Sequence, residues 1–218
     1  IGMKTVIIGG VAAGMSAATR LRRLDESAEI VVFEMGPEVS YANCGLPYFL
    51  SDTISDRSSL LLQTPQSLHR RFNLDVRVNT KVLSIEKDAK TVTTQNLQTG
   101  EQEIVGYDHL VIATGAKPRK PEIPGIDRAL TLRDVSDADR IKQLALGSKT
   151  KTAVIIGGGF IGIETAENLI DLGFGHYVGI GGKDGTYYLL DRLTFRPQGR
   201  LVWSARVVFG GNEGGFIG

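Results

Sequence analysis

The single cysteine of this sequence is the residue with the most direct chemical potential. Cys44 lies in the polar, Gly- and Pro-containing stretch Ser40–Tyr48, which reads SYANCGLPY. A lone cysteine is commonly a buried small hydrophobe. This stretch, however, can begin a helix, and a helix N-terminus favours the reactive thiolate. With no second cysteine in the chain, an oxidised Cys44 must be a sulfenic acid or a mixed disulfide with an external thiol.

Glycines follow two β-branched runs that lie about 150 residues apart. At the second, Gly157-x-Gly159-x-x-Gly162 follows a predicted strand and opens a predicted helix, as in a dinucleotide-binding turn. At the first, Gly9 and Gly14 match this spacing, but Val11 occupies the middle position. Glycine lets the backbone approach a pyrophosphate, and the helix N-terminus faces the anion.

An acidic residue supports the first turn as a nucleotide site. Glu34 ends the second predicted strand, 20 residues after Gly14, where a partner of the ribose hydroxyls belongs. Glycines at strand–helix turns can also serve packing alone. Two copies in one chain favour two bound dinucleotides, one an electron carrier and the other a hydride donor.

The composition excludes several classes of protein. Among 218 residues, 25 Lys and Arg against 24 Asp and Glu give a net charge of +1, which argues against a polybasic nucleic-acid binder and an acidic tail protein. One cysteine rules out an internal disulfide, a zinc ribbon and a Cys-x-x-Cys pair, and suits a reducing compartment. No stretch reaches the roughly 18 apolar residues that span a bilayer. We therefore expect a cytoplasmic protein with no metal site.

The first half of the chain alternates predicted strands and helices. Residues Lys4–Gly9 predict a strand, Ala13–Leu24 a helix and Glu29–Glu34 a second buried strand. This order is typical of an α/β fold with a parallel sheet. Alternating polarity over Val76–Val92 predicts an appended antiparallel hairpin, and His109–Ala113 predicts a further buried strand.

The second half begins by repeating this pattern. Three prolines within Lys117–Gly125 predict a linker. Ala153–Ile156 and Phe160–Leu172 then predict the strand and helix that start a second Rossmann-like unit. The expected domains are a first nucleotide-binding domain, a linker, the start of a second nucleotide-binding domain and an atypical tail, at residues 1–117, 118–125, 126–174 and 175–218.

The tail differs from the rest of the chain. Eleven of its 44 residues are glycine and its periodicity is poor. We expect no further strand–helix unit after Gly175, and no acidic residue that ends a second strand before Gly182. We also expect these residues to come from an out-of-frame or artificial reading of a longer gene.

Several segments together resemble a known family. In order they are GGVAAGMSAA (9–18), FE (33–34), SYANCGLPY (40–48), ATGAKP (113–118) and GGGFIGIETAE (157–167). They are similar to the single-cysteine pyridine nucleotide–disulfide oxidoreductases, above all to the coenzyme A disulfide reductases and the related NADH oxidases and CoA-persulfide reductases. The resemblance runs from about Lys4 to Phe174. It implies FAD on the first unit, NAD(P)H on the second, and a mixed disulfide of Cys44 with coenzyme A.

The resemblance also implies roles for individual residues. The catalytic residue would be Cys44. The cofactor-binding residues would be Gly9, Gly10, Val11, Ala12, Ala13, Gly14, Glu34, Val82, Thr114, Gly115 and Ala116 for FAD, and Gly157, Gly159, Gly162 and Glu164 for NAD(P)H. The residues that bind CoA would be Ser16, Arg20, Arg23, Ser40 and Asn43. The two arginines suit CoA phosphates, although a solvated helix face explains them equally well.

Single positions in the sequence argue against two other reactions known in this family. The second cysteine of two-cysteine disulfide reductases would stand where this chain has Phe49, which excludes that reaction. The histidine of NADH peroxidases would stand at Ala12, which disfavours peroxidase activity. Oxidase activity through a sulfenic acid stays open, as does an inactive nucleotide-binding fragment. Family members are homodimers about twice as long, and their partner here would be CoA disulfide or persulfide.

Overall fold

A computed structural model describes residues 2–120, 126–149, 152–157, 159–181, 187–190, 197–200 and 216–217. Contacts divide the chain into two compact units. Unit 1 comprises residues 1–42 and 61–116, and unit 2 comprises residues 43–60 and 117–218. The predicted linker lies at the start of the second part of unit 2. Its residues 117–120 have no regular structure, and residues 121–125 lie outside the described part.

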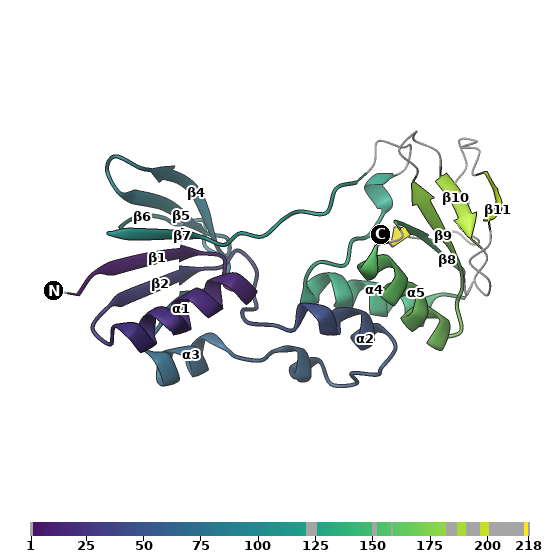
Figure 1. Ribbon diagram of the computed structural model, residues 1–218, viewed down its shortest axis with the longest axis horizontal. Coiled ribbons are helices and arrows are strands. Elements are labelled where there is room, and N and C mark those ends of the chain that lie inside the picture. The colour runs from purple at the N-terminus through teal and green to yellow at the C-terminus, as the bar shows by residue number, and fades with distance from the viewer. Residues whose placement is uncertain are drawn as a thin grey trace. The chain divides into compact units, whose positions relative to one another are not determined.

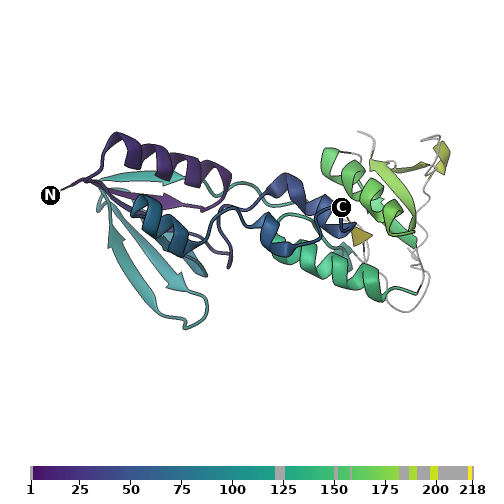
Figure 2. The same ribbon diagram turned by 90° about the horizontal axis from the view of Figure 1, so that it is seen from below.

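Unit 1 is built in three layers. Its elements are β1 (Lys4–Ile8), α1 (Ala12–Leu24), β2 (Glu29–Phe33), α3 (Pro65–Phe72), β3 (Asp75–Arg77), β4 (Thr80–Glu86), β5 (Thr91–Asn96), β6 (Gln102–Gly106) and β7 (His109–Ile112). The central sheet has the order β3-β2-β1-β7 and is parallel throughout. Helices α1 and α3 cover one face, and the antiparallel sheet β4-β5-β6 covers the other (Figures 1 and 2).

The β-branched runs form the central strands because both faces of this sheet are covered. In β1 and β2 four of five residues are buried. Ile7 and Ile30 pack with Met15 of α1 and Leu68 of α3 on one side. On the other side, Phe33 and its neighbours pack against the antiparallel sheet. The predicted α/β fold of unit 1 is therefore confirmed.

The predicted hairpin is correct in its turn but not in its first strand. Strands β4 and β5 pair antiparallel across residues 87–90, as expected. Val76, however, lies in β3, which pairs in parallel with β2. The alternation of polarity continues across Asn79, a break with φ of +50° that separates the two strands. Periodicity alone does not locate this break.

Unit 2 combines helices with a sheet of its own. Its elements are η1 (Asn43–Gly45), α2 (Leu46–Leu50), η2 (Arg57–Leu60), η3 (Ile126–Arg128), α4 (Val135–Gly147), β8 (Thr152–Ile156), α5 (Phe160–Asp171), β9 (Gly175–Gly181), β10 (Tyr187–Leu190), β11 (Pro197–Arg200) and β12 (Phe216–Ile217). The sheet has the order β11-β10-β9-β8-β12. Helix α5 packs on β8 and β9, and α2 packs on α4 and α5 (Figures 1 and 2).

The structure corrects the expectation that the second unit stops after one strand and helix. Strand β9 covers Gly175–Gly181 and pairs in parallel with β8, from Thr152↔Gly175 to Ile156↔Gly179. Three glycines in this strand lower its β propensity and obscure its pattern. The unit therefore contains a β8–α5–β9 repeat of the β1–α1–β2 arrangement. Much of the remaining tail, including residues 201–215, lies outside the described part.

Two further features complete the fold. No helix in the described part of the chain is both long enough and apolar enough to span a membrane.

Arg22 of α1 is 9% exposed, and its guanidinium joins α1 to the end of α3. Nε donates to the carbonyl of Phe72 at 2.8 Å, Nη2 to that of Asn73 at 3.0 Å and Nη1 to that of Glu26 at 2.6 Å. Arg22 is thus a structural residue, in contrast to the exposed Arg20 and Arg23.

Replacing Arg22 by methionine keeps most of the buried stem but removes the donor to these carbonyls. We expect Arg22→Met to lower the free energy of unfolding by about 2–4 kcal/mol, measured by urea denaturation, because three part-buried hydrogen bonds from a charged donor are lost. Arg23→Met, one position along on the exposed side, should change it by less than about 0.5 kcal/mol. Equal effects in the two variants would contradict the structural role of Arg22.

Candidate functional site

The first glycine turn brings two backbone segments into very close contact. Gly9 has φ of +104°, and a Cβ there would lie 2.2 Å from the carbonyl oxygen of Ala113. A Cβ on Gly14 would lie 1.8 Å from the carbonyl oxygen of Gly9. Only glycine fits at both positions, so α1 starts directly against the end of β1. This is the close approach expected of a dinucleotide-binding turn.

Glu34 is fixed against this turn. It follows β2, and its Oε2 accepts a hydrogen bond from the Gly10 N–H at 2.7 Å, while Oε1 accepts from the Gly36 N–H at 2.8 Å. The backbone N–H of Thr80 donates to the Glu34 carbonyl at 2.9 Å. Each carboxylate oxygen can accept a further hydrogen bond. Glu34 can therefore hold a ribose hydroxyl while it shapes the turn.

The helices that follow the two glycine turns have open N-termini. Helix α1 begins after Val11 and α5 after Gly159, and neither has a side-chain cap. By contrast, α3 is capped by Thr64 and α4 by Asp134. The first N–H groups of a helix need an acceptor and favour an anion. A cofactor pyrophosphate would supply this acceptor at both turns.

The other residues predicted to contact FAD fall on two elements. Thr114, Gly115 and Ala116 follow β7, which pairs with β1, and all three are exposed. Because parallel strands end at the same edge, they start at the edge that carries Gly9 and Glu34. Val82 lies on β4, where its half-buried side chain packs against the apolar cluster on the opposite face of the sheet.

The second glycine turn repeats the contact that the first makes at the start of its helix. Gly157 has φ of +118°, and a Cβ on Gly162 would lie 2.2 Å from its carbonyl oxygen. Gly159 is the residue before α5, and its carbonyl accepts from the Ile163 N–H at 3.0 Å. Glu164 is half-buried in the first half of α5. The predicted NAD(P)H residues therefore gather at one turn of unit 2.

Cys44 is exposed and free in the 3₁₀ turn η1, which leads directly into α2. Its exposure excludes the alternative of a buried small hydrophobe. Asn43 beside it is also exposed. The helical turn after the cysteine is as expected, but it is short: α2 ends at Leu50.

The residues predicted to bind CoA are divided between the units. Ser16, Arg20 and Arg23 lie exposed on α1 of unit 1, and Asn43 belongs to unit 2. Ser40, in unit 1, has φ of +49°. Its N–H donates to the Gly10 carbonyl at 2.9 Å, and its own carbonyl accepts from the Leu62 N–H at 3.1 Å. Ser40 thus joins the first glycine turn to the chain that leaves for Cys44.

Sequence reasoning missed the residues that hold the Cys44 segment, which we define as residues 43–60. Lys142 of α4 contacts Phe49 and Asp52, and Asn168 of α5 accepts from Ser51. Near the end of the segment, the Ser58 hydroxyl donates to Asp56 and lowers the pKa of that carboxyl. One signal was available: Asn168 is a polar residue on the buried face of α5.

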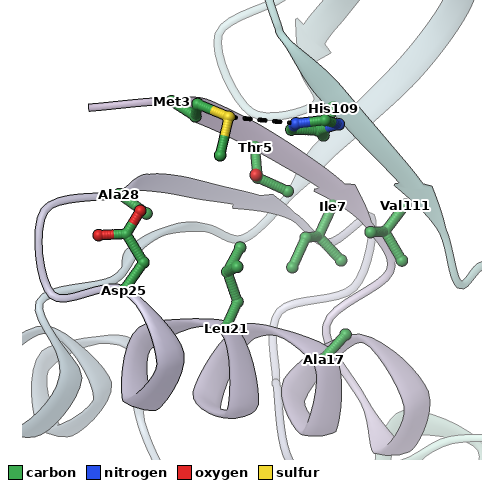
Figure 3. Close-up of a pocket in the computed structure, with 9 residues that line it drawn as sticks. All are labelled: Met3, Thr5, Ile7, Ala17, Leu21, Asp25, Ala28, His109 and Val111. Atoms are coloured by element: carbon green, nitrogen blue, oxygen red, sulfur yellow. Dashed lines mark hydrogen bonds between the residues drawn. The ribbon is translucent and has the colours of Figure 1, made fainter. Parts of the chain in front are cut away.

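A groove in unit 1 does not coincide with any of these residues. It has a volume of about 280 Å³ and lies between α1 and the strands β1 and β7 (Figure 3). Its lining is mostly apolar, with His109 Nε2 3.4 Å from the Met3 sulfur. Within the described residues, no group of three or more His, Cys, Asp or Glu side chains is arranged to hold a metal ion.

Comparisons with known proteins agree with this geometry. The sequence profile of the pyridine nucleotide-disulphide oxidoreductases matches residues 3–186. The chain belongs to the pyridine nucleotide-disulphide oxidoreductase family. The match continues beyond Phe174, where the resemblance was expected to end. This family uses FAD and NAD(P)H, and the two open glycine turns fit these cofactors.

Two of the similar proteins are a curated enzyme and a solved structure. A coenzyme A disulfide reductase of Staphylococcus aureus is 34% identical over 194 residues, which cover 89% of this chain and 44% of the relative. The structure of reduced CoADR-RHD from Bacillus anthracis is 46% identical, with a TM-score of 0.81, and the match covers 84% of this chain and 33% of that one. The chain spans less than half the length of these family members.

Two other solved structures represent related activities. A NAD-dependent persulfide reductase from A. fulgidus is 38% identical with a TM-score of 0.77, over 81% of this chain and 33% of that one. A water-forming NADH oxidase from Lactobacillus brevis is 30% identical with a TM-score of 0.77, over 83% of this chain and 40% of that one. The similarity therefore spans several members of the pyridine nucleotide-disulphide oxidoreductase family.

The close contact at the first turn predicts the effect of one methyl group. We expect Gly14→Ala to lower the free energy of unfolding by at least about 2 kcal/mol and to weaken FAD binding more than tenfold, because the Cβ meets the Gly9 carbonyl. Thermal unfolding and flavin fluorescence titration measure the two effects. Gly147→Ala, where a Cβ meets open space, is the control and should leave both unchanged or slightly improved. A Gly14→Ala chain that binds FAD normally would contradict the assignment of this turn.

Proposed function

We propose that this chain carries the redox centre and nucleotide turns of an enzyme that reduces coenzyme A disulfide or CoA persulfide with NAD(P)H. Cys44 is the catalytic residue. The observation that carries the proposal is a single, exposed cysteine in a helical turn, in a chain that also has two open glycine turns. The named activities of the S. aureus and A. fulgidus relatives support the choice of substrate.

The first turn would hold FAD through residues 9–14, Glu34, Val82 and residues 114–116. The second would hold NAD(P)H through Gly157, Gly159 and Gly162, with Glu164 near the nicotinamide. Bound FAD would supply the two-electron chemistry that links NAD(P)H to Cys44. The uncapped N–H groups at the starts of α1 and α5 would bind and orient the two pyrophosphates.

The reaction at Cys44 balances as a thiol–disulfide exchange. The Cys44 thiolate attacks one sulfur of CoA disulfide, so a Cys44–CoA disulfide forms and one CoA leaves as a thiolate that takes a proton. Two electrons and a proton then cleave this mixed disulfide into the Cys44 thiolate and a second CoA thiol. Overall, NAD(P)H, one proton and one CoA disulfide give NAD(P)⁺ and two CoA thiols.

Two groups of residues would recognise CoA. One lies in the stretch Ser40–Cys44, and the other lies on α1. Ser40 and Asn43 flank the route to the cysteine, and Ser16, Arg20 and Arg23 are exposed on α1. Guanidinium groups form strong charge-assisted hydrogen bonds with phosphates. The two arginines would therefore bind the phosphates of CoA rather than its thiol end.

Oxidase activity is the second candidate, and the similarity to the L. brevis NADH oxidase favours it. Here Cys44 would cycle through a sulfenic acid, which takes up two electrons and two protons and returns to the thiol with release of water. A non-catalytic nucleotide-binding fragment is the third reading, in which Cys44 plays no part.

We also propose how the chain is divided into domains. Residues 1–117, apart from the Cys44 segment, would form the FAD-binding domain, and 118–125 a linker. The NAD(P)H-binding domain would begin at residue 126 and continue past 174 through β9, before the atypical remainder of 175–218. The complete enzyme would be a cytoplasmic homodimer that acts on a CoA disulfide or persulfide and binds neither nucleic acid nor membrane.

Incubation of the chain with CoA disulfide should give one covalent adduct, the mass of one CoA moiety, at Cys44. Intact-mass spectrometry measures its rate of formation, and Cys44→Ser should form none. We expect the double variant Arg20→Gln/Arg23→Gln to form the CoA adduct about fivefold more slowly, because it lacks the phosphate contacts. The same variant should react normally with cystine, which carries no phosphate.

The controls separate the possible outcomes. A Cys44 that iodoacetamide alkylates but CoA disulfide does not modify would contradict the proposal. A sulfenic acid trapped at Cys44 after exposure to oxygen and NADH, without a CoA adduct, would favour the oxidase instead.

A further inference from the structure

The Cys44 segment cannot hold its own position. Helix α2 has five residues and η1 has three. Helices this short are unstable in isolation, because nucleation costs more than a single turn recovers. The position of Cys44 must therefore come from what α2 packs against, and within unit 2 these elements are α4 and α5.

Helix α4 fixes the end of α2 through a charge. Lys142 Nζ donates to the Phe49 carbonyl at 2.8 Å and to Asp52 Oδ1 at 2.6 Å. The same nitrogen lies 3.8 Å from the centroid of the Phe49 ring, and the lysine side chain is only 14% exposed. Partial burial strengthens the ion pair and the cation–π contact. Further along, Arg57 Nε pairs with Asp139 at 2.8 Å.

Helix α5 fixes the same end through a buried amide. Asn168 is 4% exposed. Its Nδ2 donates to the Glu164 carbonyl at 2.7 Å, and its Oδ1 accepts from the Ser51 hydroxyl at 2.5 Å. A buried amide costs free energy unless its polar atoms are paired, so this bond holds Ser51 in place. Ser51 directly follows α2.

Helix α5 is also the helix of the second glycine turn. It begins at Phe160 after Gly159, and Glu164 precedes Asn168 by one helical turn. A single helix thus carries the uncapped N–H groups at one end and the partner of Ser51 near the other. Ordering of its first turn by an anion would stiffen the helix to which the Cys44 segment is bonded.

We propose that Asn168 is a positioning residue that couples pyridine-nucleotide binding at the second glycine turn to the order of the Cys44 segment. Lys142 anchors the same segment independently of the nucleotide. The inference rests on the proposed function only for the identity of the nucleotide. The proposed coupling runs within unit 2, from Gly159 along α5 through Asn168 to Ser51 and α2.

Amide hydrogen exchange with and without NAD⁺ tests the coupling. NAD⁺ is used because it binds without reducing anything. In the unmodified chain we expect NAD⁺ to slow exchange about fivefold in peptides covering residues 159–163 and in peptides covering residues 43–52. In Asn168→Ala and in Ser51→Ala, we expect NAD⁺ to protect residues 159–163 as before and no longer to protect residues 43–52.

Matched variants separate coupling from general loosening. Glu167→Gln alters the exposed neighbour of Asn168 on α5 and should keep the full response. Ser51→Thr keeps the hydroxyl and should also keep it. Lys142→Met should speed exchange of residues 43–52 about tenfold both with and without NAD⁺, and Lys142→Arg should restore most of the protection.

Each remaining outcome overturns the inference in a recognisable way. If NAD⁺ protects residues 159–163 but not 43–52, or if both Asn168→Ala and Ser51→Ala keep the response, the coupling is wrong and the nucleotide site stands. If NAD⁺ protects neither peptide in the unmodified chain, the proposed nucleotide site fails together with the coupling. Because Asn168→Ala and Ser51→Ala remove the same bond from opposite sides, unfolding of one variant leaves the other to decide.

Discussion

The close contact between the start of a helix and the carbonyl of the glycine before it is the constraint on which the rest of this structure depends. In unit 1 the start of α1 meets the Gly9 carbonyl, and there is no room for a Cβ on Gly14. Glu34 and Ser40 both form hydrogen bonds to Gly10 of the same turn. This one turn therefore sets the position of Glu34 and of the chain that leaves for Cys44. Unit 2 repeats the contact between Gly162 and the Gly157 carbonyl.

The Cys44 segment interrupts the sequence of unit 1 and belongs to unit 2. It leaves unit 1 after Ala42 and returns at Leu61, and its contacts belong to unit 2. An antiparallel bridge between Tyr41 and Leu61 brings its two ends together. In the sequence, Cys44 thus lies between the two parts of unit 1, whereas α2, which follows it, packs on α4 and α5 of unit 2. Ser51, which directly follows α2, is bonded to Asn168 of α5, the helix that begins at the second glycine turn.

The sequence predicts the parts that local pattern determines. Buried β-branched runs that end in glycine are distinctive, so β1, α1, β2, β8 and α5 were all expected near their observed positions. Helix α4 was missed although Asp134 caps it through the Asp137 N–H at 2.8 Å, a pairing at short spacing that is visible in the sequence. Strand β9 was missed because its glycines hide its pattern. The bond between Ser51 and Asn168 spans 117 positions, and no local pattern indicates it. Nor does any local pattern distinguish the buried Arg22 from its exposed neighbours Arg20 and Arg23.

We propose that these two turns and Cys44 serve one redox reaction, from NAD(P)H to a CoA disulfide. An anaerobic absorbance spectrum of the purified chain with FAD tests this most directly, recorded before NADH, after NADH and after CoA disulfide. We predict a protein-bound flavin band that NADH bleaches and that one equivalent of CoA disulfide restores, with no recovery in Cys44→Ser. FAD that separates from the protein on gel filtration, or a bound flavin band that NADH leaves unchanged, would contradict it.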